Sequence, residues 1–240
     1  MKSAVIIIPT IGKSELYNCV LSCVNQTYDN LTIRLVIDGQ NYKSVVETIL
    51  SKFLYNSKVK IDVLAENVGS GGWYGHRVYA AYSLLTNQDY VFYLDEDNTI
   101  EPNHVESMIA CCEKNKLQWC YSLRNIIDEN GVFLVKDDCE SLGKWNPFTD
   151  YRHIDTSCYC LNIDTARQFS IGIFGKWGAD RNFYSVLDKY ANNYHTTGLY
   201  TLNYRLGGNQ GSVKKEFFDY GNKLVYDNYK NNFPWRNNES

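Results

Sequence analysis

The 240-residue sequence contains no apolar run that approaches the roughly 20 residues of a membrane-spanning helix. It also has no basic stripe, since its 24 Lys and Arg and 27 Asp and Glu are interspersed and leave a formal net charge of −3. The first absence excludes a transmembrane segment, and the second argues against nucleic acid as a partner. Met1-Lys2-Ser3 leads directly into a strand pattern and not into a signal sequence, which predicts a cytoplasmic, soluble protein.

The eight cysteines include no Cys-Xaa-Xaa-Cys pair. Seven of them fall within helical or strand patterns, and Cys139 falls in a loop. This distribution predicts reduced thiols that pack in the core and argues against a cysteine metal site. Internal repeats, low-complexity tracts and linkers are also missing, so we expect one domain over residues 1–240.

Buried strand patterns alternate with helical patterns in the first hundred residues. The expected strands span 4–8, 33–37, 59–64 and 90–94, and the helices begin near residues 14, 45 and 75, with Ser14 as the first N-cap. This alternation predicts an α/β fold with a mainly parallel sheet between two helical layers. The second half predicts a mixed, loop-rich lobe, with strands at 117–123, 153–161 and 198–204, a hairpin at 128–131, and helices at 103–116, 164–169, 179–190 and 214–230.

Unusual residues follow each of the four early strands: Pro9-Thr10, Asp38-Gly39, Asn67 with its glycines, and Asp95-Glu96-Asp97. In such sheets ligands bind beyond the carboxyl ends of the strands, so these residues should converge on one site. Side chains alternate along a strand, which places the first and third acids on the same side. Mg²⁺ or Mn²⁺ holding a diphosphate would relieve their repulsion. The alternative is an acidic cap of the helix after Pro102.

Four segments, in this order, resemble family 2 glycosyltransferases of the GT-A fold. They are VIIIPTIGKSELYNCVLSCVNQTYDNLTIRLVIDGQ (5–40), ENVGSGGWYGHRVYAAY (66–82), YVFYLDEDNTIEPNHVESM (90–108) and GKWGADRNFYSVL (175–187). The resemblance implies a central, mainly parallel sheet with a mixed acceptor-side lobe. Residues 1–100 would form the half that binds the nucleotide sugar, and residues 101–240 the acceptor-side half with the C-terminal helix. Within the family, the sequence resembles enzymes of bacterial glycan and polysaccharide assembly.

The resemblance implies a metal-dependent, inverting transferase that moves a sugar from a nucleoside diphosphate, with UDP expected, to a hydroxyl of a glycan or lipid-linked acceptor. A lipid-linked acceptor leaves peripheral membrane association open. The implied metal is Mn²⁺ or Mg²⁺, bound by Asp97 with Asp95 and His195. The implied contacts to the nucleotide sugar are Pro9, Thr10, Ile11, Asp38, Asn67, Gly71, Gly72, Arg77, Asp95, Glu96 and Asp97.

Inverting transfer requires a carboxylate that takes the proton of the acceptor hydroxyl. The family places it at the second acid of a Glu-Asp pair, and here the matching residues are Ala179 and Asp180. Asp180 is therefore the expected base, with Asp155 as its rival and a helix cap as its alternative role. Trp177 and Arg181, near the expected base, are candidates for acceptor contacts together with Asp155.

Two other functions remain open from the residues alone. A sugar nucleotidyltransferase also binds nucleotides and Mg²⁺ on an α/β sheet, and Lys13 in the first loop could serve its triphosphate. A non-catalytic protein that binds nucleotide sugars would explain the loss of the acid at Ala179. These alternatives differ in their products, since the first releases pyrophosphate and the second turns over nothing.

Overall fold

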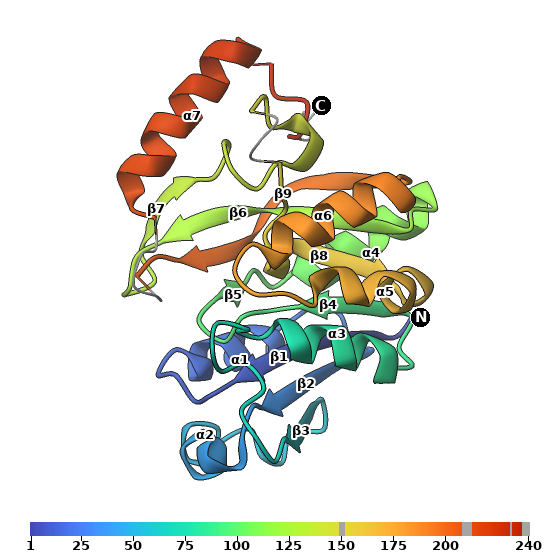
Figure 1. Ribbon diagram of the computed structural model, residues 1–240, viewed down its shortest axis with the longest axis vertical. Helices are drawn as coiled ribbons and strands as arrows, with labels where there is room; N and C mark the ends of the chain where they lie inside the picture. Colours follow the sequence, from blue (N-terminus) through green and yellow to red (C-terminus); the bar gives the residue numbers. More distant parts are fainter. Residues whose placement is uncertain (149–151, 208–212, 231, 237–240) are drawn as a thin grey trace.

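The computed structural model describes residues 1–148, 152–207, 213–230 and 232–236 (Figure 1). Its strands are β1 (Ala4–Thr10), β2 (Leu31–Ile37), β3 (Val59–Val63), β4 (Tyr90–Tyr93), β5 (Thr99–Ile100), β6 (Trp119–Ile127), β7 (Phe133–Lys136), β8 (Tyr159–Asn162) and β9 (Tyr194–Arg205). Its α-helices are α1 (Leu16–Val24), α2 (Lys43–Ile49), α3 (His76–Leu85), α4 (His104–Asn115), α5 (Ile163–Phe169), α6 (Ala179–Tyr190) and α7 (Lys215–Tyr229). Short 3₁₀ turns include η4 (Thr156–Cys158) and η5 (Ser170–Ile173).

All of these strands belong to one sheet, in the order β3-β2-β1-β4-β8-β6-β9-β5, with β7 paired to β6 outside this path. Strands β3, β2, β1 and β4 are parallel to one another. From β8 onward the sheet is mixed, because β8 is antiparallel to both β4 and β6 whereas β9 is parallel to β6. The predicted parallel half and mixed half are thus both present, and both contribute strands to the same sheet.

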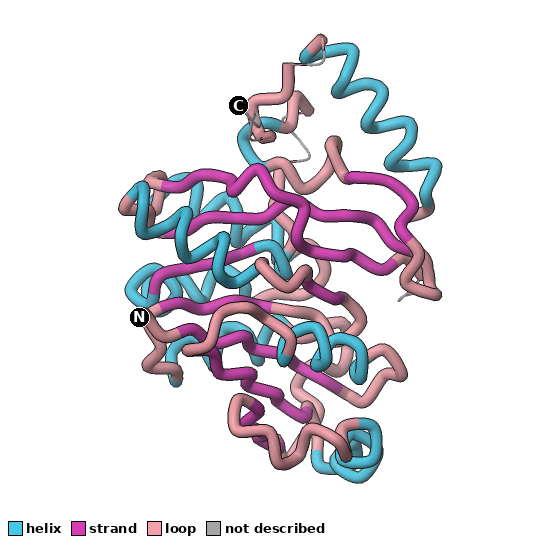
Figure 2. The backbone as a smooth tube through the Cα atoms, turned by 180° about the vertical axis from the view of Figure 1, so that it is seen from behind, coloured by secondary structure: helices cyan, strands magenta, loops and turns pink. Residues whose placement is uncertain are grey.

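Helices cover both faces of the sheet. Helices α3, α5 and α6 lie side by side on one face, and α1 and α4 lie on the other (Figures 1 and 2). Every residue of β1, Ala4-Val-Ile-Ile-Ile-Pro-Thr10, is buried, as expected for a parallel strand between two helical layers. Helix α7 stands apart at the far end of the molecule, where it contacts β7.

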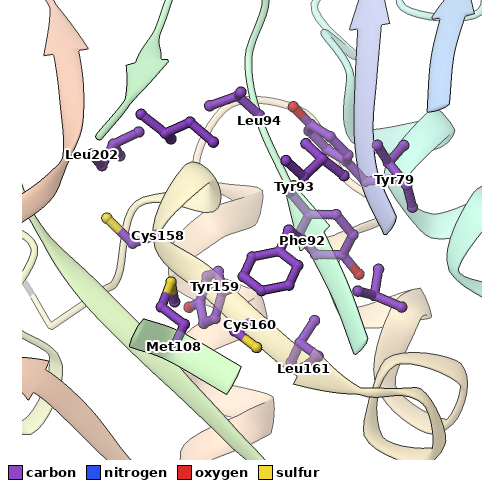
Figure 3. Close-up of a cluster of buried hydrophobic side chains, with 14 of the residues drawn as sticks. Tyr79, Phe92, Tyr93, Leu94, Met108, Cys158, Tyr159, Cys160, Leu161 and Leu202 are labelled. Carbon is purple, nitrogen blue, oxygen red and sulfur yellow. The ribbon is translucent and has the colours of Figure 1, made fainter. Parts of the chain in front are cut away.

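The hydrophobic core is continuous across the junction between the two halves. There Val91 and Phe92 of β4 pair with Leu161 and Cys160 of β8. Figure 3 shows this region, in which Phe92 and Tyr93 lie beside Tyr159, Cys160 and Leu161. These side chains are all nearly inaccessible to solvent, so the two halves share one apolar interior.

Two local expectations were wrong, and one short strand was missed. Ser14 does not cap α1, since Glu15 is the N-cap residue and the Ser14 hydroxyl donates to the Glu15 carboxylate instead. The strand expected over 153–161 begins only at Tyr159, because the Asp155 carboxylate accepts a hydrogen bond from Ser157 N and starts the turn η4. The two-residue strand β5 was not predicted, as so short a segment carries no periodic signal.

None of the helices in the described residues is both long enough and apolar enough to cross a membrane. The longest, α7, carries several charged side chains among its 15 residues.

Candidate functional site

A cleft of about 620 Å³ opens where the carboxyl ends of β1, β2 and β4 face the N-terminus of α6. It brings together most of the residues that the sequence indicated, although they are spread over more than 170 positions. Those that line it are Pro9, Thr10, Ile11, Asp38, Asn67, Asp95, Glu96, Asp97, Asp155, Trp177, Asp180 and Arg181. The prediction that the strand ends converge is therefore correct.

Glu96 organises the loop that follows β1. Its buried carboxylate accepts hydrogen bonds from the Thr10 hydroxyl (2.5 Å) and from the backbone N–H groups of Ile11 (3.2 Å), Gly12 (3.2 Å) and Lys13 (3.0 Å). Burial raises the pKa of Glu96, while these hydrogen bonds act in the opposite direction. Glu96 thus fixes the backbone of the first loop, and its two oxygens are engaged within the protein.

Asp38 plays the same part for the glycine-rich loop. Its carboxylate is 3% exposed and accepts from the backbone N–H groups of Val68 (2.7 Å) and Gly69 (2.8 Å). A Cβ atom at Gly69 would lie 2.2 Å from the Tyr74 carbonyl oxygen and 2.6 Å from Asp38 Oδ2. Only glycine can occupy this position, because no side chain fits between the loop and the carboxylate.

Three predicted donor contacts do not line the cleft. Gly71 and Gly72 have φ angles of 67° and 83°, and nothing lies within 4 Å of their Cβ positions, so they form an open turn. Arg77 stacks on Trp73, with its Cζ 3.7 Å from the ring centroid, and donates to the Val68 carbonyl (3.2 Å). Its guanidinium therefore stabilises the glycine-rich loop through Val68 and Trp73 and does not line the cleft.

Asp95 and Asp97 form the acidic part of the cleft. Asp95 accepts from the Tyr79 hydroxyl (2.7 Å), and Asp97 pairs with the Lys13 ammonium (2.8 Å). Burial and the carboxylates of Asp97 and Asp155 raise the pKa of Asp95 to about 7. The pair thus carries more negative charge than Lys13 balances.

The chemistry of this donor set fits a hard divalent cation. Two carboxylates from one short segment, partly open to a cleft, match the way in which Mg²⁺ is held by one or two acids together with substrate phosphates. Burial, together with the carboxylates of Asp97 and Asp155, disfavours the charged form of Asp95, and a bound cation would offset this by stabilising the carboxylate. Asp95 and Asp97 are therefore the residues that could hold Mn²⁺ or Mg²⁺.

Asp180 lines the cleft from the first turn of α6. The N-cap residue of this helix is Gly178, whose φ of 85° is a conformation that favours glycine. Asp180 Oδ1 accepts from the Arg181 N–H (2.9 Å), and Oδ2 lies 3.7 Å from His153 Nε2. Trp177 is 75% exposed beside it, with Arg181 Cζ 5.0 Å from the Trp177 ring centroid. An acid, a cationic side chain and an open aromatic face thus share this wall.

Asp155 belongs to a buried ion cluster on the same wall. The Arg124 guanidinium is 2% exposed and donates to Asp155 Oδ2 (2.8 Å), to Asp137 Oδ2 (2.7 Å) and to the Glu140 carboxylate. The other oxygen of Asp155 accepts from the Ser157 N–H (2.9 Å). Burial raises the pKa of Asp155, and the charge of Arg124 opposes this shift. Both oxygens of Asp155 are thus committed to internal partners.

His195 is not part of the cleft. It is an exposed residue near the start of β9, in register with Cys120 of β6, and its Nδ1 lies 2.7 Å from the Thr196 carbonyl oxygen. The expectation of a third metal ligand at this residue fails, because β9 reaches the cleft only at its other end, at Tyr204 and Arg205.

Sequence reasoning missed several residues that line the cleft, among them Arg124, Glu140, Tyr204 and Arg205. Arg205 Nε donates to the Asp97 carbonyl (3.0 Å), and its backbone N–H donates to Asn98 Oδ1 (3.1 Å). These residues come from β6, β9 and the loop after β7, where no motif marks them. An arginine within an otherwise apolar strand, as at Arg124, was the one available signal.

The sequence model of glycosyl transferase family 2 matches residues 5–175, from the start of β1 to the segment just before α6. The chain belongs to glycosyltransferase family 2. The matched residues include the strand ends, both loops and the acidic segment, whereas Asp180 lies five residues beyond the match. No curated protein sequence matches the chain at the level required to count as a relative.

Solved structures of S. aureus TarS show the same architecture. S. aureus TarS, residues 1–349, superposes with a TM-score of 0.65 at 15% identity and covers 95% of this chain and 66% of its own. The TarS complex with UDP-GlcNAc gives a TM-score of 0.66 at 14% identity, with 96% and 67% covered, and the complex with UDP gives 0.66 at 16%, with 95% and 66% covered. The chain thus has the GT-A fold and spans about two-thirds of the TarS fragment.

Proposed function

We propose that this protein is a metal-dependent, inverting glycosyltransferase that moves a sugar from a nucleoside diphosphate to a hydroxyl group of a glycan or lipid-linked acceptor. The observation that carries this proposal is the cleft itself, which brings together the acids Asp95 and Asp97, just after β4, and Asp180, in the first turn of α6. Membership of glycosyltransferase family 2 supports the same reaction class. Residues 1–100 would hold the donor and residues 101–240 the acceptor, within a single domain.

On the donor wall, Pro9, Thr10 and Ile11 would contact the nucleotide base, with Asn67 beside them. Asp38 also lines the cleft, and its two oxygens already accept from the Val68 and Gly69 N–H groups. A remaining lone pair of this carboxylate would accept the imide N–H of uracil, so we propose a UDP-sugar. TarS, which shares the fold, has been solved with UDP and with UDP-GlcNAc. Glu96 and Arg77 act indirectly, since each holds a loop in place.

Asp97 and Asp95 would hold Mn²⁺ or Mg²⁺ on the donor wall. The cation supplies positive charge to the departing nucleoside diphosphate, which lowers the barrier to breaking the glycosidic bond. Lys13 already lies 2.8 Å from Asp97, so its ammonium is placed to add a second positive charge beside the phosphates.

Asp180 is the proposed base, which takes the proton of the acceptor hydroxyl. Asp155 is the weaker candidate, because Arg124 and Ser157 N occupy its two oxygens. Asp180 Oδ2 has His153 Nε2 only at 3.7 Å, and Asp180 lines the same cleft as the acidic pair. For inversion, this base would have to act on the face of the sugar away from the leaving group.

The exposed ring of Trp177 and the guanidinium of Arg181 form the proposed acceptor contacts. A flat apolar ring matches the C–H face of a sugar, and Arg181 can donate hydrogen bonds to hydroxyl or phosphate groups. A glycan or a lipid-linked saccharide would fit both.

The eight cysteines are all free thiols, which supports a reducing, cytoplasmic location.

The test is release of UDP from a panel of UDP-sugars, with Mn²⁺, with Mg²⁺ and with chelator, followed by assignment of the anomeric configuration of the product by NMR. The proposal expects metal-dependent release of UDP from one sugar, and inverted configuration in the product. Release of pyrophosphate from a nucleoside triphosphate would indicate a nucleotidyltransferase instead. Tight binding of the donor without turnover, even by hydrolysis, would indicate a non-catalytic binding protein.

A further inference from the structure

Three cysteines that lie far apart in the sequence meet in the core, on the opposite side of the sheet from α6. Cys112 comes from the last turns of α4, Cys120 from β6 and Cys160 from β8. Their sulfur atoms all lie within 4.8 Å of one another, and each residue is at most 1% exposed. Cys120 and Cys160 are direct partners across the antiparallel β6 and β8 pair, so their side chains leave the sheet on the same face.

This arrangement has the size and chemistry of a thiolate metal site. Zinc bonds to cysteine sulfur at about 2.3 Å, which places two sulfur ligands of one tetrahedral ion about 3.8 Å apart. The three sulfur atoms need to approach by no more than about 1 Å to reach that spacing. Three soft sulfur ligands in an apolar shell select Zn²⁺ or Cu⁺ over the hard cations that suit the acidic cleft.

Two further groups lie near the cluster. Cys111 precedes Cys112 in α4 and is partly buried, and its Sγ lies 4.0 Å from the Thr196 carbonyl oxygen, outside the group of three sulfur atoms. Cys120 Sγ lies 3.2 Å from the Met108 carbonyl oxygen. Cys111 would therefore have to shift its side chain to serve as a fourth ligand.

We propose that Cys112, Cys120 and Cys160 form a structural site for Zn²⁺, with Cys111 or the Met108 carbonyl completing the coordination. Zn²⁺ balances two of the three thiolate charges, whereas Cu⁺ would balance only one, and unbalanced charge is costly in such an apolar place. The ion would tie α4 to β6 and β8, and so link a helix to the centre of the mixed half of the sheet. The absence of a Cys-Xaa-Xaa-Cys pair hides this site from sequence reasoning, because its ligands come from three separate elements.

The first test uses the intact wild-type chain, purified with reductant, stripped of metal with chelator and checked for eight reduced thiols. Addition of Co²⁺ under anaerobic conditions should produce a thiolate-to-cobalt charge-transfer band with tetrahedral d–d bands. The charge-transfer band should saturate at one equivalent of Co²⁺, and Zn²⁺ should displace the ion. Zinc should also raise the melting temperature of the stripped protein. A folded protein that gives no charge-transfer band with Co²⁺ overturns the proposal.

Two variants locate the site. Cys120→Ala should abolish the charge-transfer band, and Cys112→Ala should weaken binding of Co²⁺ at least tenfold, which provides a second readout if the first variant does not fold. The matched control is Cys19→Ala with Cys23→Ala, which removes two other fully buried thiols, in α1, and should leave the band unchanged. A band that persists in folded Cys120→Ala, or that is lost in the control, contradicts the assignment.

The proposed cysteine site and the proposed metal site of the acidic cleft can be tested independently. Asp95 and Asp97 offer only oxygen ligands, so an ion bound there gives no thiolate charge-transfer band. Asp97→Ala should therefore leave the Co²⁺ signal of the cysteines intact while it removes metal-dependent turnover. If that variant loses the charge-transfer band instead, the ion is not bound by Cys112, Cys120 and Cys160 alone, and the proposed site is wrong.

Discussion

The two walls of the cleft are held in place by different physical means. On the donor wall, Glu96 and Asp38 each bind backbone N–H groups of an adjacent loop, so the loop conformation depends on short contacts to one carboxylate. The wall that carries Asp155 and Asp180 is proposed to hold the acceptor and is called the acceptor wall. There the buried guanidinium of Arg124 binds the carboxylates of Asp137, Glu140 and Asp155. A single substitution on the donor wall should therefore disturb one loop, whereas loss of Arg124 should destabilise the whole acceptor wall.

The largest effect should follow replacement of the proposed base on the acceptor wall. Asp180→Asn keeps the size of the side chain and removes its ability to take a proton, so kcat should fall by about 10² to 10⁴, with donor affinity unchanged. The measurement is steady-state kinetics with donor and acceptor varied separately.

Asp164→Asn is the matched control, because Asp164 is likewise an acid in the first turn of a helix, α5, but is exposed and does not line the cleft. Equal and small effects of the two changes would mean that Asp180 only interacts with its helix dipole, and the assignment of the base would be lost.

Replacement of Arg124 on the acceptor wall should cause the largest loss of stability. Arg124→Leu leaves three carboxylates without their partner, and breaking a buried ion pair in this way costs about 3–5 kcal/mol. Arg34→Leu breaks a pair whose side chains are 34% and 36% exposed, Arg34 and Asp62, and should cost at most about 1 kcal/mol. Urea unfolding of the two variants measures the difference, and equal costs would refute the special role of the buried cluster.

A single change should disturb one loop of the donor wall. Glu96→Gln retains one carbonyl oxygen and converts the other acceptor into an NH₂ donor, which faces the N–H groups that it should accept. We expect a loss of about 1–3 kcal/mol in the free energy of unfolding. Asp97→Asn, one position on, should weaken metal-dependent donor binding with little loss of stability. The opposite pattern in thermal melts and donor titrations would show that Glu96 contacts the ligand directly.

The smallest predicted effect concerns pH and the link between α4 and β9. His104 is 2% exposed, its Nδ1 lies 2.8 Å from the Thr201 hydroxyl oxygen, and burial lowers its pKa to about 3. Because the unfolded chain binds this proton near pH 6.5, the stability contributed by neutral His104 is full above that value and is lost as pH falls towards 3.

Between pH 7 and pH 5 this linkage should cost roughly 2 kcal/mol. His104→Gln, which keeps a polar side chain without a titrating group, should flatten the stability profile in that window. Denaturant unfolding at several pH values checks both, and a variant with the wild-type slope would place the pH dependence elsewhere.

Prediction from the sequence succeeded where a short stretch carries its own physics. The buried strands 4–8, 33–37 and 90–94 are apolar runs that end in polar residues, and parallel topology brings those ends together, so the acidic pair was placed correctly. Prediction failed where the partner lies far along the chain. Arg77 was expected at the diphosphate, yet Trp73 and Phe174 surround it, and the second of these is almost a hundred residues away.

The glycines give the same lesson at a finer scale. Gly71 and Gly72 were expected from the resemblance to contact the nucleotide sugar, whereas Gly69 is the residue that cannot carry a side chain, owing to Asp38 and Tyr74. The ion cluster of Arg124 and the meeting of Cys112, Cys120 and Cys160 also depend on tertiary contacts. Arg124 within a strand pattern was a signal for the first, but its three partners could not be read from the sequence, and no local pattern indicated the second.

The central claim is that the cleft holds a nucleoside diphosphate through a cation bound by Asp95 and Asp97. Thermal melts of the wild-type protein and Asp97→Ala, with UDP, GDP, CDP and dTDP, each with and without Mn²⁺, test it most directly. The account predicts that UDP raises the melting temperature of the wild-type protein only when Mn²⁺ is present, and that Asp97→Ala loses this shift. Equal melting temperatures in all conditions, or an undiminished shift in Asp97→Ala, would contradict it.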